Sequence, residues 1–252
     1  MKRSRVDVIN SYIQEKGEVK ITELSELYPD ISSMTIRRDI EYLEKEGLIV
    51  RTKGGAKSIE HLSNLKEKIY SLRANENITA KINIAQKALN FMNGVNSIYM
   101  DSGTTTMALS RIIPNKNMLV LTSGANVGLE LLKKSNINVI LTGGIVNRDT
   151  LSVSGHRAIE IVNTINIEVA FLATSGFSLS TGFSCGNFDE CELKRTVIKR
   201  AQKTVLLIDS SKINKNMPYT FADLNDIDYL ICEEVLSDEV KEAAKSAGTE
   251  IL

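Results

Sequence analysis

The stretch SSMTIRRDIEYLEKEGLIVRTKGGAK, residues 32–57, determines how the first part of this sequence is interpreted. Apolar residues recur every three or four positions from Ile36 to Leu43, which is the spacing of one helix face that packs on a core. Ser32 can cap such a helix, because its hydroxyl accepts a hydrogen bond from a backbone N–H of the first turn. The pair Arg37–Arg38 falls away from the apolar face, so the stretch predicts a helix that presents two arginines to solvent.

A short basic hairpin is predicted directly after this helix. Gly47 suits the left-handed residue that ends a helix, and Leu48–Val50 is a short β-prone run. Gly54–Gly55 can then make the tight turn of a wing that runs along a DNA backbone. In helix-turn-helix proteins the second helix places its N-terminal residues on base edges, where arginine fits guanine and phosphate. The residues expected to contact DNA are Ser33, Thr35, Arg37, Arg38, Arg51, Lys53 and Lys57.

The upstream residues complete a small module. Apolar residues from Val6 to Ile13 predict a first helix, and Glu18–Ile21 predicts a small strand. Thr22 is expected to cap a second short helix over Glu23–Tyr28. Exposed arginines alone would indicate only a solvated surface. The order helix, helix, turn, helix and wing within the first 57 residues matches one DNA-binding module.

The composition indicates a globular protein. The chain has 252 residues, of which 42% are hydrophobic and 25% charged, which suits one large domain or two domains. No apolar run approaches the length of a membrane span and the first ten residues lack a signal-peptide core, so a cytoplasmic protein without membrane contact is expected. The few cysteines and histidines show no metal-ligand spacing and no disulfide framework, so no metal is expected.

Net charge does not by itself indicate DNA binding. The whole chain has a formal net charge of zero, and residues 1–57 contain eleven Lys and Arg against ten Asp and Glu. A strongly basic domain would be the usual footprint of a nucleic-acid partner. The prediction of DNA binding therefore depends on where the charges lie. The acidic residues of the third helix follow Arg37–Arg38 in the sequence and lie away from the N-terminal end of that helix.

A second pattern begins after residues 58–75, which are polar, of mixed charge, and interpreted as a linker that is partly helical. A helix near Thr79–Met92 is followed by alternating strands and helices, which predicts a mainly parallel sheet covered on both faces. The predicted strands are Ser97–Met100, Met118–Leu121, Asn138–Leu141, Val169–Ala173, Thr204–Ile208 and Tyr229–Cys232.

The residues that follow these strands suggest a ligand site. Ligands of open α/β sheets bind outside the carboxyl ends of the strands, and five of these ends have hydroxyls, glycines or a lysine. Such groups, with helix N-termini, suit an oxyanion such as phosphate. No dinucleotide or P-loop fingerprint is present, so a small phosphorylated molecule is expected and no cofactor. The five turns are Asp101–Thr106, Thr122–Gly124, Thr142–Gly144, Thr174–Gly176 and Asp209–Lys212.

Over nearly its whole length the chain resembles the DeoR family of bacterial transcription regulators. The resemblance implies an α/β protein with a winged helix-turn-helix at residues 1–57, a linker at 58–75, and an effector-sensing and oligomerisation domain at 76–252. The sensor of this family is similar in fold to sugar-phosphate isomerases and coenzyme A transferases. The motifs that carry the resemblance are Thr35–Ile40 and Gly54–Ala56 in the first domain, and Asp101–Thr106, Gly143–Gly144, Glu190, Lys194 and Asp209–Lys212 in the second.

The resemblance also implies a function. It indicates a homo-oligomeric regulator, dimer or tetramer, that binds double-stranded operator DNA. It is expected to repress a carbohydrate-metabolism operon and to respond to a phosphorylated sugar or sugar alcohol. The sequence departs from the family pattern at Ser123-Gly124 and at Ala173. The residues expected to bind the effector are Asp101, Ser102, Gly103, Thr104, Thr105, Thr122, Ser123, Gly143, Gly144, Glu190, Lys194 and Lys212.

Two other functions remain open at this stage. The acids and lysines at one rim could transfer protons in a sugar-phosphate isomerase-like enzyme with an added N-terminal domain. However, neither histidine follows a predicted strand, and an enzyme does not explain the winged helix. A protein-interaction module leaves the arginine pair and basic wing without a role. A regulator without catalytic residues is therefore the prediction.

Overall fold

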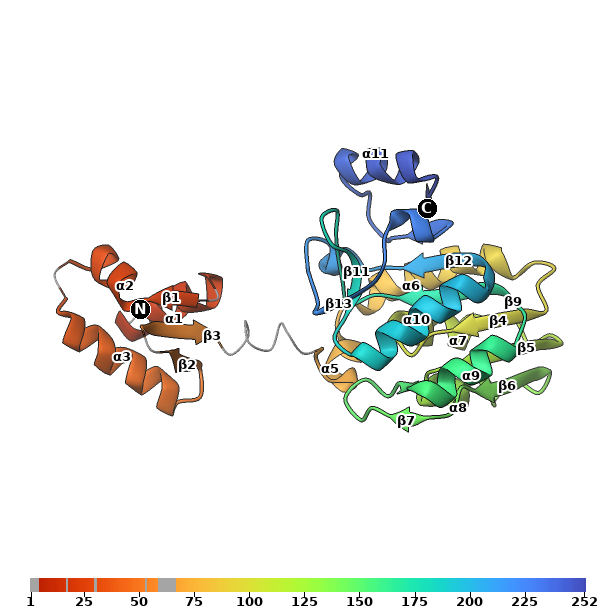
Figure 1. The fold of residues 1–252 in the computed structure, drawn as a ribbon, viewed down its shortest axis with the longest axis horizontal. Helices are drawn as coiled ribbons and strands as arrows, with labels where there is room; N and C mark the ends of the chain where they lie inside the picture. Colours follow the sequence, from red (N-terminus) through yellow and green to blue (C-terminus); the bar gives the residue numbers. More distant parts are fainter. Residues whose placement is uncertain (1–4, 17, 30, 53, 59–66) are drawn as a thin grey trace. The chain divides into compact units, whose positions relative to one another are not determined.

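The computed structural model describes residues 5–16, 18–29, 31–52, 54–58 and 67–252. The chain divides into two compact units, Met1–Lys66 and Glu67–Leu252, which are described separately below (Figure 1). Among the described residues, no helix is long and apolar enough to cross a membrane.

The first unit packs three helices against a small antiparallel sheet with the strand order β1-β3-β2. Its core contains Ile36, Ile40 and Leu43, so the predicted apolar face of the third helix is confirmed. Gly55 pairs with Lys20 of β1, where an added Cβ would collide with the Val19 carbonyl. The elements are α1 (Arg5–Lys16), β1 (Glu18–Lys20), α2 (Ile21–Leu27), α3 (Ser33–Lys45), β2 (Ile49–Thr52) and β3 (Gly55–Ser58).

The ends of α3 form as predicted. The Ser32 hydroxyl accepts a hydrogen bond from the Thr35 amide at 3.2 Å, which makes Ser32 the N-cap. At the other end Gly47 has a φ of +70°, the left-handed conformation that glycine adopts without strain. The helix that presents Arg37–Arg38 is therefore fixed by its own termini as well as by the core.

The start of α2 differs from the prediction. Thr22 does not cap this helix, because α2 already begins at Ile21 and its N-cap, Lys20, makes no side-chain cap hydrogen bond. Instead the Ile21 amide donates to the Gly54 carbonyl at 2.8 Å. A long-range contact with the wing thus satisfies the first amide of the helix in place of a local side-chain cap.

The second unit is built on a parallel sheet of seven strands with the order β15-β14-β12-β9-β4-β5-β6, so the predicted α/β fold is confirmed. Its helices are α5 (Tyr70–Asn75), α6 (Ile78–Ala88), α7 (Thr104–Ile112), α8 (Ala125–Leu131), α9 (His156–Thr164), α10 (Phe188–Arg200) and α11 (Asp238–Ala247). The sheet strands are β4 (Ser97–Met100), β5 (Met118–Thr122), β6 (Ile137–Leu141), β9 (Ile167–Ala173), β12 (Ala201–Leu207), β14 (Tyr229–Ile231) and β15 (Glu250–Ile251).

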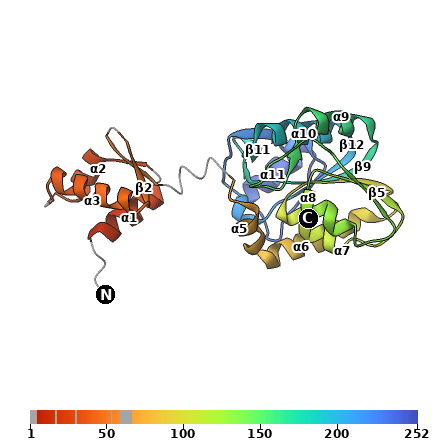
Figure 2. The same ribbon diagram turned by 90° about the horizontal axis from the view of Figure 1, so that it is seen from below.

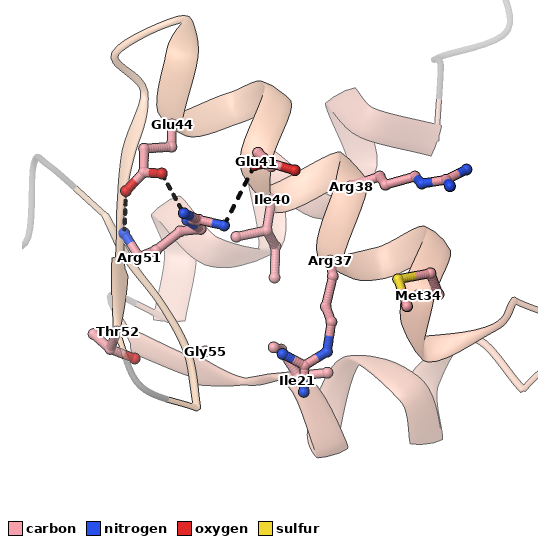
Figure 3. A pocket seen from close by; sticks show the side chains of 10 residues that line it. All are labelled: Ile21, Met34, Arg37, Arg38, Ile40, Glu41, Glu44, Arg51, Thr52 and Gly55. Atoms are coloured by element: carbon pink, nitrogen blue, oxygen red, sulfur yellow. Dashed lines mark hydrogen bonds and ion pairs between the residues drawn. The ribbon is translucent and has the colours of Figure 1, made fainter.

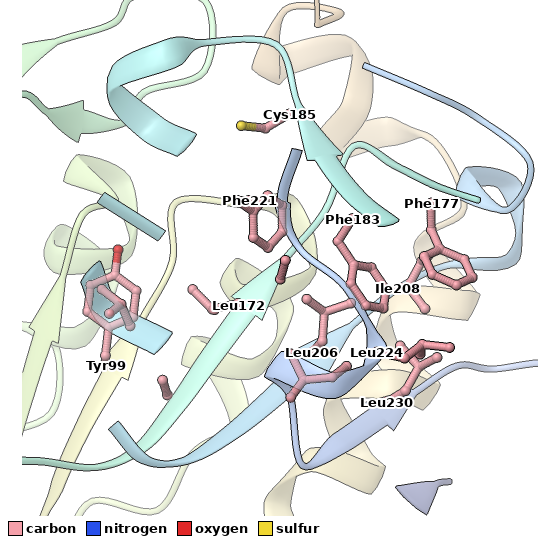
Figure 4. Close-up of a cluster of buried hydrophobic side chains, with 14 of the residues drawn as sticks. Tyr99, Leu172, Phe177, Phe183, Cys185, Leu206, Ile208, Phe221, Leu224 and Leu230 are labelled. Carbon is pink, nitrogen blue, oxygen red and sulfur yellow. The ribbon is translucent and has the colours of Figure 1, made fainter. Parts of the chain in front are cut away.

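Helices cover both faces of this sheet. Figure 2 shows α9 and α10 on one face and α6 and α7 on the other. Neighbouring residues of β9 accordingly face opposite layers, with Phe171 in the cluster of α6, α7 and α8 and Leu172 in the cluster of α9 and α10. Figure 4 shows the second cluster, where Phe177 stacks on Phe183 with ring centroids 4.4 Å apart.

Several short strands were not predicted from the sequence. They form an antiparallel sheet of β10 (Gly176–Ser178), β11 (Gly182–Cys185) and β13 (Tyr219–Ala222), and a hairpin of β7 (Ile145–Val146) and β8 (Val153–Ser154). Each has only two to four residues and none shows a long buried run. Within the predicted linker, residues 59–66 lie outside the described residues, Ser58 ends β3, and residues 67–75 belong to the second unit.

Candidate functional site

The arginine pair of α3 lies on the surface of the first unit. Arg37 and Arg38 are both exposed, and within the described part of the chain neither makes an ion pair. Figure 3 shows Arg37 directed toward Ile21 across a groove between α3 and the wing, whereas the side chain of Arg38 extends in another direction, away from Ile21. The groove has a volume of about 550 Å³. It is lined by Ile21, Met34, Arg37, Arg38, Ile40, Glu41, Glu44, Arg51, Thr52 and Gly55.

The acid that follows these arginines has a structural role. Asp39 is buried, and its two carboxylate oxygens accept from the Arg5 guanidinium of α1 at 2.7 and 2.8 Å. This two-bond contact joins α1 to α3, because a guanidinium and a carboxylate match in plane and spacing. Asp39 therefore does not offset the arginines at the helix surface.

Two cations of the wing, Arg51 and Lys57, are already paired within the unit. The Arg51 guanidinium lies 2.6 Å from Glu44 and 3.8 Å from Glu41, as Figure 3 shows, and Lys57 lies 3.0 Å from Glu18 on the neighbouring strand. Exposed pairs of this kind are weak, so a DNA phosphate can compete for the cations. Lys53, also predicted to contact DNA, lies outside the described residues.

The remaining predicted contacts are at the N-terminus of α3. Ser33 is exposed in the first turn of the helix, and the Thr35 hydroxyl lies 2.9 Å from the hydroxyl of Ser32. The tip of α3 thus combines two hydroxyl residues with the unpaired arginines. This set of donors suits phosphate oxygens and base edges.

We expect Glu44→Gln to tighten DNA binding about two- to fivefold, since an exposed ion pair is worth about 0.5–1 kcal/mol. The substitution frees Arg51 for phosphate, so the slope of log K against log salt should steepen by about one. Fluorescence anisotropy with DNA from upstream of the protein's own gene, at several salt concentrations, measures both. Glu26→Gln, an exposed acid of α2, is the matched control. An equal gain with Glu26→Gln would contradict a specific role of the Glu44 pair.

A second candidate site lies in the second unit, where β4 and β9 end near the start of α10. The structure brings five of the predicted effector-binding residues together there: Asp101, Ser102, Gly103, Glu190 and Lys194. The lining also contains Glu67, Arg73, Thr150, Ala173, Thr174 and Ser175. The cavity among these residues measures only about 20 Å³, room for about one water molecule.

A buried ion pair forms the floor of this pocket. The Lys194 ammonium contacts the Asp101 carboxylate and donates to the Ala173 carbonyl at 2.8 Å, and the two side chains are 7% and 4% exposed. The Ala173 amide donates to the same carboxylate at 3.0 Å. Burial lowers the pKa of Lys194, but the surrounding groups, with Asp101 the foremost of them, together outweigh this effect and the pKa is raised. Lys194 is therefore held charged.

Glu190 lies one helical turn before Lys194 on α10 and faces the same pocket. Its carboxylate accepts hydrogen bonds from Thr150 at 2.7 Å and from Ser152 at 2.5 Å. Burial raises the pKa of Glu190, and the nearby Glu67 carboxylate raises it further. Burial and the neighbouring carboxylate thus both favour the neutral form of Glu190.

The other predicted effector residues do not line this cavity. Thr104 and Thr105 form the first turn of α7, and Thr122 and Ser123 are buried at the end of β5. Gly143–Gly144 precedes β7 with positive φ values of +69° and +113°. Lys212 ends a short 3-10 turn; burial lowers its pKa and the charge of Asp209 opposes this effect.

Sequence reasoning did not identify Glu67, Arg73 or Thr150 as site residues. Glu67 and Arg73 fall in the stretch interpreted as a linker, and Thr150 lies in a loop without a strand-end pattern. Among the described residues, no three His, Cys, Asp or Glu side chains lie where they could share a metal ion.

Comparisons with known proteins agree with this two-part organisation. The profile of the DeoR-like helix-turn-helix domain matches residues 5–61, and that of the DeoR C-terminal sensor domain matches residues 76–234. An uncharacterized HTH-type transcriptional regulator of Bacillus subtilis is 33% identical over 92% of this chain and 87% of its own length. A putative aga operon transcriptional repressor of Escherichia coli O157:H7 is 29% identical over 98% of this chain and 92% of its own.

Among solved structures, the chain is similar to ribose 5-phosphate isomerase A from Methanocaldococcus jannaschii, with a TM-score of 0.42 and 15% identity over 56% of each chain. The profile matches cover both units, and the sequence relatives extend over nearly the full length. The chain therefore belongs to the DeoR family of DNA-binding transcription regulators.

Proposed function

We propose that this regulator represses a carbohydrate operon, responds to a phosphorylated sugar or sugar alcohol, and is not an enzyme. The observation that carries the proposal is a pocket of paired ions at the carboxyl ends of parallel strands, in a chain that also has a DNA-binding unit. The E. coli relative, named as a repressor of the aga operon, supports the choice of target and sign.

The state of the pocket argues against turnover. Lys194 is bound to Asp101 and the Ala173 carbonyl, and the carboxyl group of Glu190 is held by two hydroxyls, so both side chains are already engaged within the protein. A general acid or base must instead reach a substrate proton within hydrogen-bond distance. Incubation with ribose 5-phosphate should give no isomerised product, and turnover would favour the enzyme alternative.

The phosphate is proposed to bind next to the start of α7. Gly103, the N-cap residue of this helix, makes no side-chain cap hydrogen bond, which leaves first-turn amides available to an anion. Asp101 and Glu190 can accept hydrogen bonds from sugar hydroxyls nearby. The positions Thr122, Ser123, Gly143, Gly144 and Lys212 stay predictions of the sequence.

Calorimetric titration tests this proposal. A panel of sugar phosphates is compared with the parent sugars, and at least one phosphate ester should bind about 100-fold more tightly than its parent, because the dianion supplies the charge-assisted contacts. The same ester should change the band shift of DNA from upstream of the protein's own gene. Equal affinities for phosphorylated and parent sugars would refute the effector class.

We also propose that the regulator acts as a homo-oligomer. Paired half-sites on DNA are bound by symmetric assemblies that present two recognition helices. Sedimentation of the full chain should therefore give a mass of a dimer or a tetramer.

A further inference from the structure

We propose that Arg73 is the phosphate-binding cation of the sensor pocket and that Glu67 holds the position of the phosphate until the effector displaces it. This inference rests on the proposed function, because it names the groups by which the same pocket takes its ligand. Both residues precede Ser97–Met100, the first predicted strand of the second unit, and neither belongs to the strand-end turns that suggested the site.

The Glu67 carboxylate lies in the pocket, where it is bound by an arginine and a hydroxyl, groups that would also suit a phosphate. Its Oε1 accepts from the Arg73 guanidinium at 3.2 Å and from the Ser175 hydroxyl. The side chain is only 9% exposed and lines the cavity with Ser102, Gly103 and Glu190. A carboxylate held by an arginine and a hydroxyl offers the same contacts that a phosphate oxygen takes.

The hydrogen bonding of the Glu67 carboxylate is incomplete. Its Oε2 is buried, and no hydrogen-bond partner for it exists among the described residues. The same carboxylate raises the pKa of Glu190, which shows that the two acids repel each other. A buried acceptor without a partner costs free energy, so Glu67 can be replaced by an anion that uses the pocket more fully.

The volume of the pocket also requires a movement. About 20 Å³ is free, whereas pockets for small ligands usually measure about 300–1,000 Å³. Asp101 and Lys194 are fixed by each other and by the backbone of Ala173. Glu67 lies on the chain that enters the unit, so its withdrawal opens space without breaking the sheet.

Arg73 is the cation best placed to receive the phosphate. Its Nε donates to the Lys68 carbonyl at 2.9 Å, and the side chain is only 12% exposed, so the guanidinium is already oriented. The ammonium of Lys194 is committed to Asp101, and Lys212 is not part of the lining. A guanidinium can also bind a phosphate through two parallel hydrogen bonds.

Displacement of Glu67 would affect the residues at the beginning of the second unit. The first unit ends at Lys66 in the sequence, and Glu67 is the first residue of the second unit. Close by, the Tyr70 amide donates to the Asp149 carbonyl at 2.6 Å, which anchors α5 to the second unit. A ligand that expels Glu67 thus acts on the first residues of the sensor, next to the link with the DNA-binding unit.

The test titrates the full chain with inorganic phosphate and with the sugar-phosphate panel. Glu67→Gln should bind them at least about tenfold more tightly than the wild type, because an internal competitor is lost. Arg73→Met should bind at least about tenfold more weakly, and Arg73→Lys should recover part of the loss. Glu76→Gln, whose carboxylate pairs with the exposed Lys68, should behave like the wild type.

Amide hydrogen exchange provides a second readout that a merely structural role of Glu67 would not produce. In the wild type the ligand should accelerate exchange in residues 67–73, whereas Glu67→Gln should show the faster exchange without ligand. Circular dichroism melts check that each variant is folded.

Three results would overturn the inference. Equal affinities of wild type and Glu67→Gln would refute the displacement and leave the proposed effector class intact. A loss of affinity in Lys212→Met but not in Arg73→Met would show that Lys212, and not Arg73, is the cation that binds the phosphate. If no phosphate ester binds the wild type or Glu67→Gln, both the effector class and this inference fail.

Discussion

Lys194→Met is expected to destabilise the second unit by about 3–5 kcal/mol, because it leaves the Asp101 carboxylate buried without its counter-ion. Both side chains are less than 10% exposed, so bulk solvent does not compensate for the lost ammonium. The Ala173 carbonyl loses its hydrogen bond as well, and the Ala173 amide keeps only an uncompensated carboxylate as its acceptor. Urea unfolding followed by circular dichroism measures the loss in the transition of this unit.

Two further variants separate the pair from its surroundings. Lys199→Met changes an exposed lysine of the same helix and should cost little. The double variant Asp101→Asn with Lys194→Met should recover part of the loss, since a neutral amide replaces the isolated charge. A loss below about 1 kcal/mol in Lys194→Met would mean that the buried pair does not stabilise the floor of the pocket.

Arg37→Ala and Arg38→Ala are each expected to weaken operator binding by about 1–3 kcal/mol, a factor of about 5 to 150 in affinity. The reason is that both are exposed cations of α3 without an ion pair in the described structure, and both lie toward the end of the helix that bears the hydroxyls. Thermal stability should stay close to that of the wild type, because both side chains are exposed. Anisotropy with the DNA upstream of the gene, at one fixed salt concentration, gives the affinities.

Lys45→Ala is the matched control, because Lys45 is an exposed cation at the opposite end of α3. It should reduce affinity less and equally for all DNA sequences, as a distant charge contributes only to the general field. If both arginine variants bound the operator like the wild type, α3 would not be the recognition helix.

The elements that could be predicted are those whose signals are local. The third helix has its apolar spacing, its Ser32 cap and its terminal Gly47 within one stretch, and the central parallel strands are short buried runs. The start of α2 could not be predicted, because the amide of Ile21 is satisfied by Gly54, more than thirty residues away. Strands as short as β7 and β10 have too few residues to show a period.

In the candidate pocket, too, some residues could be predicted from the sequence and others could not. Asp101 could be expected at this site, because it follows a strand of the parallel sheet, whereas Glu190 and Lys194 were expected beside it only from the resemblance to the DeoR family. The buried pairing of Lys194 with Asp101 is a contact between residues 93 positions apart and has no local sign. Glu67 and Arg73 belong to a polar stretch, and only the folded chain places them inside the cavity.

The buried carboxylate of Glu67 has a consequence for gene control. A competitor built into the chain raises the metabolite concentration needed for a response, without touching the groups that choose the metabolite. The trigger threshold and the chemical selectivity can then change independently, the first through Glu67 and the second through the residues around the sugar. Relatives of this regulator could shift their set point to match the abundance of a nutrient by a single substitution, while still answering to the same molecule.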